Sequence, residues 1–382
     1  MKKNLLLALG ATAFVLTANA TVRTVNNNSN SPGQYTTIQA AVTASSAGDT
    51  ILVAGSATTY TGTINVNKKL TFIGPGYNPD KQNPLVATTD GAFTLNSSNA
   101  SGSTIMGFKL MYGINFASGA ILNNIAIRRN SIEGGQFTYV SIADSTANLT
   151  ISENYFSTSG SIRITTAKSH LNMQIVNNIF TGYYPINYVT GAATPTPTNY
   201  KPITFAHNLF IAGNNNNPLI SINWATLLGG KSVYNVIIKN NIFYNTNGST
   251  GNVYTPFINC TFNNNITFAG ASLPLMPSTG NIGSGNINNT DPEFVSIFNT
   301  SNTVDFNLDN LRLKSTSPAR NAATDGSDIG PTGGTYPIYL STNQYLTGEP
   351  TIPEIKFMNF VGASSTPPGG TLQINVKAKK IN

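Results

Sequence analysis

The 382-residue sequence is poor in cysteine and in charge. Its one cysteine, Cys260, excludes an internal disulfide framework and a cysteine-based metal site. Charged residues make up 9% of the chain, which is low for the surface of a globular protein. Asparagine, serine, threonine and glycine must therefore cover much of the surface, and the apolar core must hold the fold together.

Acidic residues are missing from the middle of the chain. No Asp or Glu occurs between residues 154 and 290, whereas five basic residues fall there: Arg163, Lys168, Lys201, Lys231 and Lys239. Calcium sites need clustered oxygen ligands, typically carboxylates, so we expect no metal in this block and no other cofactor. The positive block favours attraction to an anionic polymer, although charges spread over several repeats also account for plain solubility.

The first 20 residues have the pattern of a cleaved secretory signal peptide. Lys2 and Lys3 precede an apolar run over 5–16, and Ala18 and Ala20 supply small residues at the cleavage site. The run is shorter than the roughly 18 residues that a membrane span needs, and no longer apolar run follows, so we expect no transmembrane segment. Secretion, display at the cell surface and retention in the periplasm all fit this prediction.

One short phrase recurs through residues 127–268: an apolar residue, two variable residues, asparagine, a variable residue and an apolar residue. Its asparagines are Asn130, Asn154, Asn178, Asn208, Asn241 and Asn265, separated by 24, 24, 30, 33 and 24 residues. This period indicates a solenoid whose coils each bury one face against their neighbours. We expect Leu149, Ile151 and Phe156 of one coil to point inward, and the asparagines to stack as a ladder of amide hydrogen bonds.

The segment before the repeats predicts a cap. Ile38, Ala41 and Val42 stand at helical spacing after an N-cap at Thr36 or Thr37, which predicts a helix that ends near Gly48. Short β-rich runs follow at 49–55, 64–66 and 70–74. A helix here would close the open end of the strand stack. Residues 21–30 show no periodicity and are predicted to form an exposed lead-in.

The cap sequence and the closing sequence together resemble one family. They are YTTIQAAV at 35–42 with GDTI at 48–51, and then DPEFV at 291–295, DFNL at 305–308, LRLKSTSPA at 311–319 and DIG at 328–330. Combined with the Asn-x-Phe coils, they resemble secreted bacterial proteins of the pectate-lyase-like superfamily. The resemblance implies an all-β fold, a right-handed parallel β-helix solenoid with an N-terminal capping helix and a short C-terminal extension. It implies no single activity, because the superfamily includes lyases, hydrolases, esterases, epimerases, phage tailspikes and proteins with no known reaction.

The repeat ends near residue 337, and the sequence over 372–378 alternates like one half-buried strand. We therefore predict five segments: a signal peptide (1–20), an N-terminal cap and first coils (21–75), a parallel β-helix (76–300), C-terminal coils (301–345), and a linker with a terminal strand (346–382).

The two coils between Asn178 and Asn241 are longer than the others, and insertions in a solenoid emerge as loops where binding residues often lie. Aromatic rings stack on sugar faces, and amides and hydroxyls bond their hydroxyl groups. The candidate carbohydrate-binding residues are Tyr183, Tyr184, Tyr188, Tyr200, Lys201 and Trp224. Packing along the flank of the solenoid is their alternative role.

A polysaccharide lyase would need a group that neutralises the substrate carboxylate, and a base. The candidate catalytic residues for such a reaction are Arg163, Lys168, His170 and His207. His207 directly precedes a ladder asparagine and is predicted to face outward at a bend. Hydrolysis by paired carboxylates is disfavoured, because Glu153 is in register with Arg129, where a surface ion pair is the simpler account.

The leading functional hypothesis is an exported, non-catalytic protein that binds an extracellular carbohydrate or other polymer, with an anionic polysaccharide favoured by the positive block. The alternative is a polysaccharide lyase that acts on an acidic glycan, so the sequence leaves open whether the protein is an enzyme. Nucleic acid is not an expected partner, because the charge is modest, no known module is present and the chain is exported.

Overall fold

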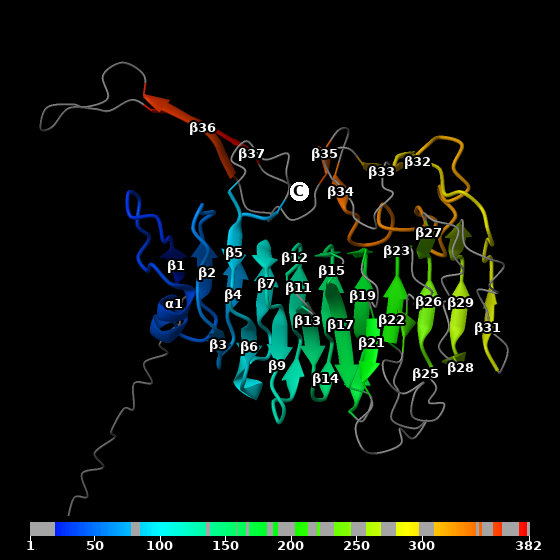
Figure 1. The fold of residues 1–382 in the computed structure, drawn as a ribbon, viewed down its shortest axis with the longest axis horizontal. Helices are drawn as coiled ribbons and strands as arrows, with labels where there is room; N and C mark the ends of the chain where they lie inside the picture. The colour runs from blue at the N-terminus through cyan, green and yellow to red at the C-terminus, as the bar shows by residue number, and fades with distance from the viewer. Residues whose placement is uncertain are drawn as a thin grey trace, which may run out of the picture.

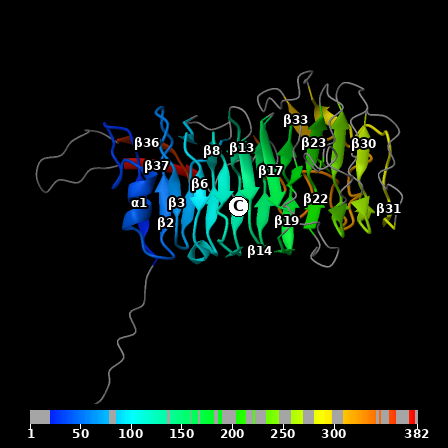
Figure 2. The same cartoon turned by 60° about the horizontal axis from the view of Figure 1, so that its bottom comes forward.

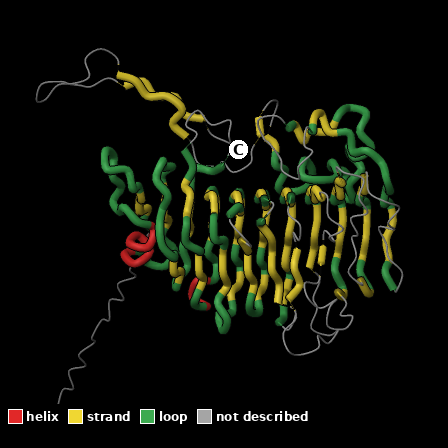
Figure 3. Tube along the Cα trace, in the orientation of Figure 1, coloured by secondary structure: helices red, strands yellow, loops and turns green. Residues whose placement is uncertain are grey.

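The chain folds as a parallel β-helix (Figure 1). The computed structural model describes residues 20–77, 85–134, 138–157, 159–165, 168–181, 186–189, 203–212, 220–221, 233–245, 257–268, 280–297, 309–340, 344–345, 354–360 and 374–379. Short strands follow one another around each coil and stack on the coils before and after (Figures 2 and 3). The predicted fold class is confirmed.

Three long parallel sheets form the walls of the solenoid. Sheet A contains β1 (Val22–Val25), β2 (Thr50–Val53), β4 (Thr71–Ile73), β7 (Thr104–Met106), β11 (Ala126–Arg128), β15 (Thr150–Ser152), β19 (Met173–Val176), β22 (Ile203–Ala206), β26 (Ile237–Lys239), β29 (Thr261–Asn263) and β31 (Ile282–Ser284). Sheet B contains β5 (Ala87–Thr89), β8 (Phe108–Leu110), β12 (Ser131–Ile132), β16 (Tyr155–Phe156), β20 (Ile179–Phe180), β23 (Leu209–Ala212), β27 (Ile242–Asn245) and β30 (Ile266–Phe268).

Sheet C contains β3 (Ile64–Val66), β6 (Phe93–Leu95), β9 (Ile114–Phe116), β13 (Thr138–Ile142), β17 (Gly160–Thr165), β21 (Ile186–Val189) and β24 (Ile220–Ser221). The smaller parallel sheets are β10 (Leu122–Asn123) with β14 (Thr146–Ala147) and β18 (His170–Leu171), and β25 (Val233–Tyr234) with β28 (Phe257–Ile258). The 3₁₀ turn η1 (Ser98–Ala100) precedes β7.

The core forms because equivalent apolar residues of successive coils stack in register. In sheet A, Ile127 pairs with Ile105 and Ile151, and Ile175 pairs with Ile151 and Phe205; all five side chains are buried. In sheet B the equivalent phenylalanines stack face to face, with successive centroid distances of 4.6, 4.9 and 5.1 Å in the order Phe156, Phe180, Phe210 and Phe243. A constant turn between the sheets keeps this register.

The predicted asparagine ladder is confirmed at that turn. The amide Nδ2 of Asn130 donates to Oδ1 of Asn154 at 3.1 Å, and Asn154 donates in the same way to Asn178 at 3.0 Å. The pattern continues through Asn208, Asn241 and Asn265 to Asn286. The asparagines from Asn130 to Asn265 are buried, so the ladder belongs to the scaffold.

The residue before each ladder asparagine has left-handed backbone geometry, a region that favours asparagine and glycine. The row consists of Arg129, Glu153, Asn177, His207, Asn240, Asn264 and Gly285, with φ between 50° and 69°. Arg129, Glu153 and His207 depart from the favoured residues. Such departures persist only where other contacts compensate for the strain.

The N-terminal cap is the helix α1 (Ile38–Ala44), whose N-cap Thr37 accepts a hydrogen bond from the Ala40 amide. Ile38, Ala41 and Val42 are buried, so the predicted cap is confirmed. The predicted lead-in over 21–30 is wrong in part, because β1 pairs in parallel with β2. A four-residue edge strand that buries Val25 is held by its backbone pairing and shows no readable periodicity.

The C-terminal region folds back along the solenoid. β32 (Phe294–Ser296) and β33 (Asn310–Leu313) pair antiparallel, and turns over 314–338 then lie against the A–B turns of the coils, as the orange segment of Figure 1 shows. We call residues 322–336 the strap. Two antiparallel hairpins follow, β34 (Tyr339–Leu340) with β35 (Gln344–Tyr345), and β36 (Glu354–Phe360) with β37 (Ile374–Lys379). β37 is the strand predicted at 372–378; β36 was not predicted.

Candidate functional site

The outward face of sheet C carries one hydrogen-bonding residue per coil. The register aligns Asn65, Thr94, Asn115, Ser141 and Arg163 in a single row. The backbone register continues this row to Asn187 and Ser221. Since neighbouring strands lie about 4.8 Å apart, the row presents a polar group at that interval along the solenoid axis.

These polar residues point outward because strand neighbours alternate between the two faces of a sheet. On β13, Val140 and Ile142 are buried on either side of Ser141, and on β17, Ile162 and Ile164 are buried on either side of Arg163. Within the described part of the chain, the side chains of Asn65, Thr94, Asn115 and Ser141 make no hydrogen bond. The row is therefore available to an external ligand.

Arg163 is the one charged member of the described row. Its side chain is exposed, and its guanidinium carbon lies 5.7 Å from the ring centroid of Tyr139 on the neighbouring strand. Burial raises the pKa of Tyr139, and the Arg163 charge offsets only part of that effect. The Tyr139 phenol is therefore protonated at neutral pH, and the pair offers a cation beside an aromatic hydroxyl.

Lys168 lies just beyond β17 and is paired. Its ammonium is 3.0 Å from a carboxylate oxygen of Asp144, which also accepts backbone hydrogen bonds from Gly119 and Ser145. Burial alone would raise the pKa of Asp144, but the bonds from Ser145, Gly119 and Lys168 outweigh burial and lower it. The Lys168 charge is therefore already balanced.

His170 lies in the same corner and is 4% exposed. Its Nε2 is 2.9 Å from the Thr165 carbonyl oxygen, which only accepts, so Nε2 carries the proton. Nδ1 is buried and has no hydrogen-bond partner among the described residues. Burial lowers the pKa of His170, opposed by the Thr165 carbonyl and by Asp144, so the ring is neutral at pH 7.

His207 lies on a different part of the solenoid, in the left-handed row of the A–B turns. Its predicted position at a bend is confirmed, but the side chain is 4% exposed because the strap covers it. Its Nδ1 is 3.1 Å from the Asp328 carbonyl oxygen. The structure thus brings Arg163, Lys168 and His170 into one region and separates His207 from them.

The ion pair expected between Glu153 and Arg129 is confirmed, at 2.8 Å, but it is buried and not at the surface. Glu153 is 2% exposed and also pairs with Arg128 at 2.7 Å. The strap again explains the difference, because the Arg128 guanidinium lies 4.7 Å from the ring centroid of Tyr336.

The candidate carbohydrate-binding residues fall mostly outside the described residues: Tyr183, Tyr184, Tyr200, Lys201 and Trp224. The backbone of Tyr188 belongs to β21 and pairs with Ile164, next to the outward row and not in it. Sequence reasoning missed Tyr139 and the row itself. The signal that could have found them is the two-residue alternation within each sheet C strand.

Three further features of the described residues concern metal ligands, the cysteine thiol and membrane-spanning helices. No group of three or more His, Cys, Asp or Glu side chains there is placed to hold a metal ion. Cys260 is buried, and burial raises its pKa to about 11, which makes it an unreactive core thiol. The described segments also include no helix with the length and hydropathy that a membrane span requires.

The strand register and the asparagine ladder define the class of this molecule, a parallel β-helix protein. No protein-family model matches the chain, and a comparison with curated proteins also gives no match. Among solved structures, the chain is similar to a pectin methylesterase from Aspergillus niger, with 17% identity and a TM-score of 0.29 over 83% of this chain and 96% of that chain. At this identity and TM-score, the likeness carries no inference about function.

The two buried histidines predict a loss of stability in mild acid. The pKa values of His170 and His207 are lowered below 6.5, chiefly by burial, so the folded chain binds these protons more weakly than the unfolded chain does. Their contribution to stability is complete above pH 6.5 and is lost as the pH falls toward the lowered values. We expect the melting temperature to fall between pH 7 and pH 5, a window above the range in which Asp144 and Asp325 titrate.

A double variant, His170→Gln with His207→Asn, is the matched control. Glutamine retains a donor for the Thr165 carbonyl, and asparagine suits the left-handed geometry at residue 207. Melting curves of this variant should change much less between pH 7 and pH 5. An equally steep fall in both proteins would show that other groups control the acid response.

Proposed function

We propose that this chain is an exported protein that binds an extracellular polysaccharide along the outward face of sheet C without catalysing a reaction on it. The unbroken row of hydrogen-bonding residues, one per coil, carries the proposal. In this proposal residues 1–20 are a cleaved signal peptide, 21–345 form the capped β-helix with its C-terminal coils, and 346–382 are a terminal extension.

The row suits a polymer with a short repeat. The row repeats at the spacing of adjacent parallel strands, roughly 4.8 Å, which is comparable with the length of one pyranose ring. Successive sugar hydroxyls would then meet successive side chains, such as Thr94, Asn115 and Ser141, which both donate and accept hydrogen bonds. The Arg163 guanidinium adds a forked donor for one carboxylate, which favours an acidic glycan.

A lyase acting on an acidic glycan is the alternative, and the environment of the candidate catalytic groups supports binding over it. A general base must lie within about 3 Å of the proton that it removes. The free lone pair of His170 is buried, and the Tyr139 phenol has a raised pKa. His207 belongs to the A–B turns and not to the sheet C face.

We expect the variant Arg163→Ala to weaken retention by acidic polysaccharides about tenfold, since it removes the charged member of the row. The measurement is affinity electrophoresis through gels that contain polygalacturonate, alginate or a neutral β-glucan. Lys314→Met removes one exposed positive charge from the turn after β33, outside both proposed binding surfaces, and is the matched control. Equal weakening by both variants would reduce the effect to net charge and contradict the assigned face.

The same protein samples test the alternative. A lyase produces unsaturated uronides, whose ultraviolet absorbance rises during the reaction. We expect no rise on any acidic polysaccharide of the panel. A rise that disappears in Arg163→Ala would replace the binding proposal with catalysis.

A further inference from the structure

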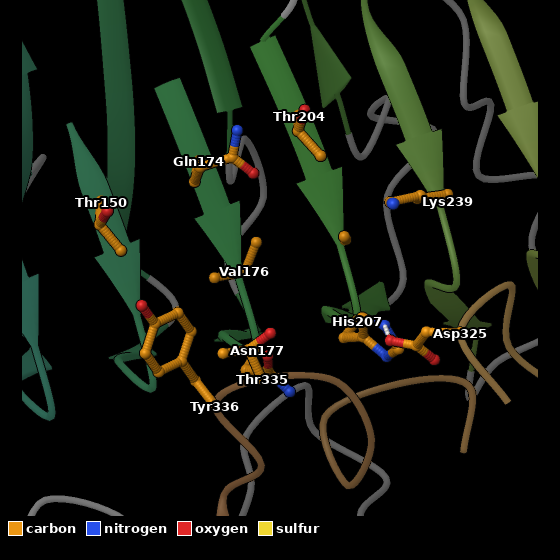
Figure 4. Close-up of a pocket in the computed structure, with 11 residues that line it drawn as sticks. Thr150, Gln174, Val176, Asn177, Thr204, His207, Lys239, Asp325, Thr335 and Tyr336 are labelled. Carbon is orange, nitrogen blue, oxygen red and sulfur yellow. Dashed lines mark ion pairs between the residues drawn. The ribbon is translucent and has the colours of Figure 1, made fainter. Parts of the chain in front are cut away.

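A small groove lies between the strap and the outward face of sheet A, away from sheet C. Its volume is about 170 Å³, and β15, β19, β22 and β26 form its floor. Figure 4 shows Asn177 and His207 at its lower edge, Tyr336 and Asp325 on the strap side, and Lys239 on the far strand. This site is independent of the polar row, because the two use different sheets.

The side-chain oxygen of Asn177 lacks a hydrogen-bond donor at this groove. Its side chain is 1% exposed, and its Nδ2 donates to the carbonyl oxygens of Pro331 at 3.2 Å and Gly333 at 2.6 Å. Both partners only accept, so the amide cannot be turned around. Its Oδ1 is buried and has no donor among the described residues. A buried acceptor without a donor is costly, so this atom calls for a hydroxyl or another donor from outside the chain.

Gln174 and Asp325 add further acceptors to the lining of the groove. The Nε2 of Gln174 already donates to Asn172 at 3.0 Å, which leaves its Oε1 as an acceptor. Asp325 adds a carboxylate. Burial tends to raise the pKa of Asp325, but hydrogen bonds from Ser327 outweigh burial and lower it, so this group is ionised at neutral pH.

Two basic groups complete the lining. Lys239 makes no ion pair with a described residue, and its ammonium extends from β26 toward β22 in Figure 4. His207 is neutral, because burial lowers its pKa. Its Nδ1 carries the proton toward the Asp328 carbonyl, so Nε2 accepts from Asn240 at 3.0 Å. The Nε2 atom also lies 3.3 Å from Oδ2 of Asp325, a contact that is an ion pair only when His207 is protonated. At neutral pH His207 is satisfied by Asp328 and Asn240, and Lys239 is the charged donor left for a ligand.

We propose that this groove binds one neutral sugar unit. Ligand hydroxyls would donate to Oδ1 of Asn177, Oε1 of Gln174 and the Asp325 carboxylate, and would accept from Lys239. Engineered cavities of about 150 Å³ hold benzene, so a groove of about 170 Å³ has room for one six-membered ring. The ionised Asp325 disfavours an acidic sugar at the same place.

The test is calorimetric titration of the full mature chain with glucose, galactose, mannose and N-acetylglucosamine, and with glucuronate and galacturonate. We expect at least one neutral sugar to bind with a Kd near 1 mM, the range for so small a ligand, and the uronates to bind at least threefold more weakly. Binding confined to the uronates would overturn the neutral class. No binding by any sugar would mean that water alone fills the groove.

Variants locate the site without disturbing the strap, which Asn177 itself holds. Lys239→Met and Gln174→Met should each weaken sugar binding about tenfold, with unchanged melting temperatures. Arg163→Ala should leave monosaccharide binding intact and weaken polysaccharide retention, so that failure of either proposal is seen separately. Sugar binding that survives both groove variants would overturn the assignment.

Discussion

An Asn208→Ala variant is expected to lose roughly 3–5 kcal/mol of the free energy of unfolding, because the change strands buried polar groups on both adjacent coils. Oδ1 of Asn208 accepts from the backbone and side-chain nitrogens of Asn178 at 2.9 and 3.1 Å. Its Nδ2 donates to the Ile175 carbonyl at 2.8 Å and to Asn241 at 3.0 Å. Alanine supplies none of these bonds in a position that water does not reach.

The matched control is a second, exposed asparagine ladder on the opposite turn. Asn172 donates to Asn148 at 2.9 Å, and Asn148 donates to Asn124 at 2.9 Å. Asn172 has a φ of 50°, which glycine tolerates, so Asn172→Gly should cost less than about 1 kcal/mol. Urea unfolding curves of both variants give the comparison. Similar losses in the two variants would mean that burial adds little to the stability that a ladder asparagine provides, which contradicts the prediction.

The asparagine ladder could be predicted from the sequence because each coil repeats the same short sequence pattern. An apolar residue, a turn residue, asparagine and another apolar residue recur at steps that match one coil, as in Ile151 to Phe156 and Ile175 to Phe180. The apolar positions must face the core, and a buried turn amide must find a partner in the next coil. Fold, core and cap all follow from contacts that are local or one coil apart.

The sheet C row could not be predicted in the same way. Ser141 follows its ladder asparagine, Asn130, by 11 residues, whereas Arg163 and Asn187 follow theirs by 9. The connection between sheets B and C thus changes length from coil to coil. A shift of one residue would place the opposite set of side chains on the outer face, so the row appears only once the register is known.

The position of the strap could not be predicted from the sequence, for a different reason. Asn177 bonds to Pro331 and Gly333 across 154 and 156 residues of sequence, and no periodic signal spans that interval. Burial of His207 and Glu153 and the groove itself depend on this single return of the chain. The one available hint was the occurrence of arginine, glutamate and histidine in a turn position that elsewhere holds asparagine or glycine.

Glu153 stands at a turn position that favours asparagine, and its substitution is expected to have the second large effect on the free energy of unfolding. Its carboxylate accepts from Arg129 at 2.8 Å and from Arg128 at 2.7 Å, and both Glu153 and Arg129 are buried. Removing one member of a buried ion pair costs about 3–5 kcal/mol, since it leaves an uncompensated buried charge. Asparagine relieves about 1 kcal/mol of left-handed backbone strain at this position, so Glu153→Asn should destabilise the protein by a net 2–4 kcal/mol, approximately.

The double variant Arg129→Asn with Glu153→Asn should recover most of that loss. Both positions then carry the residue that the turn favours, as Asn177 and Asn240 do in later coils, and no buried charge is left unpaired. Arg128 is more exposed than Arg129 and retains its contact with Tyr336, so water and the ring accommodate its charge. A double-mutant cycle in urea measures the coupling between the two sites. A double variant no more stable than Glu153→Asn would show that the ion pair does not compensate for the strained turn, and that the strap is held by other contacts.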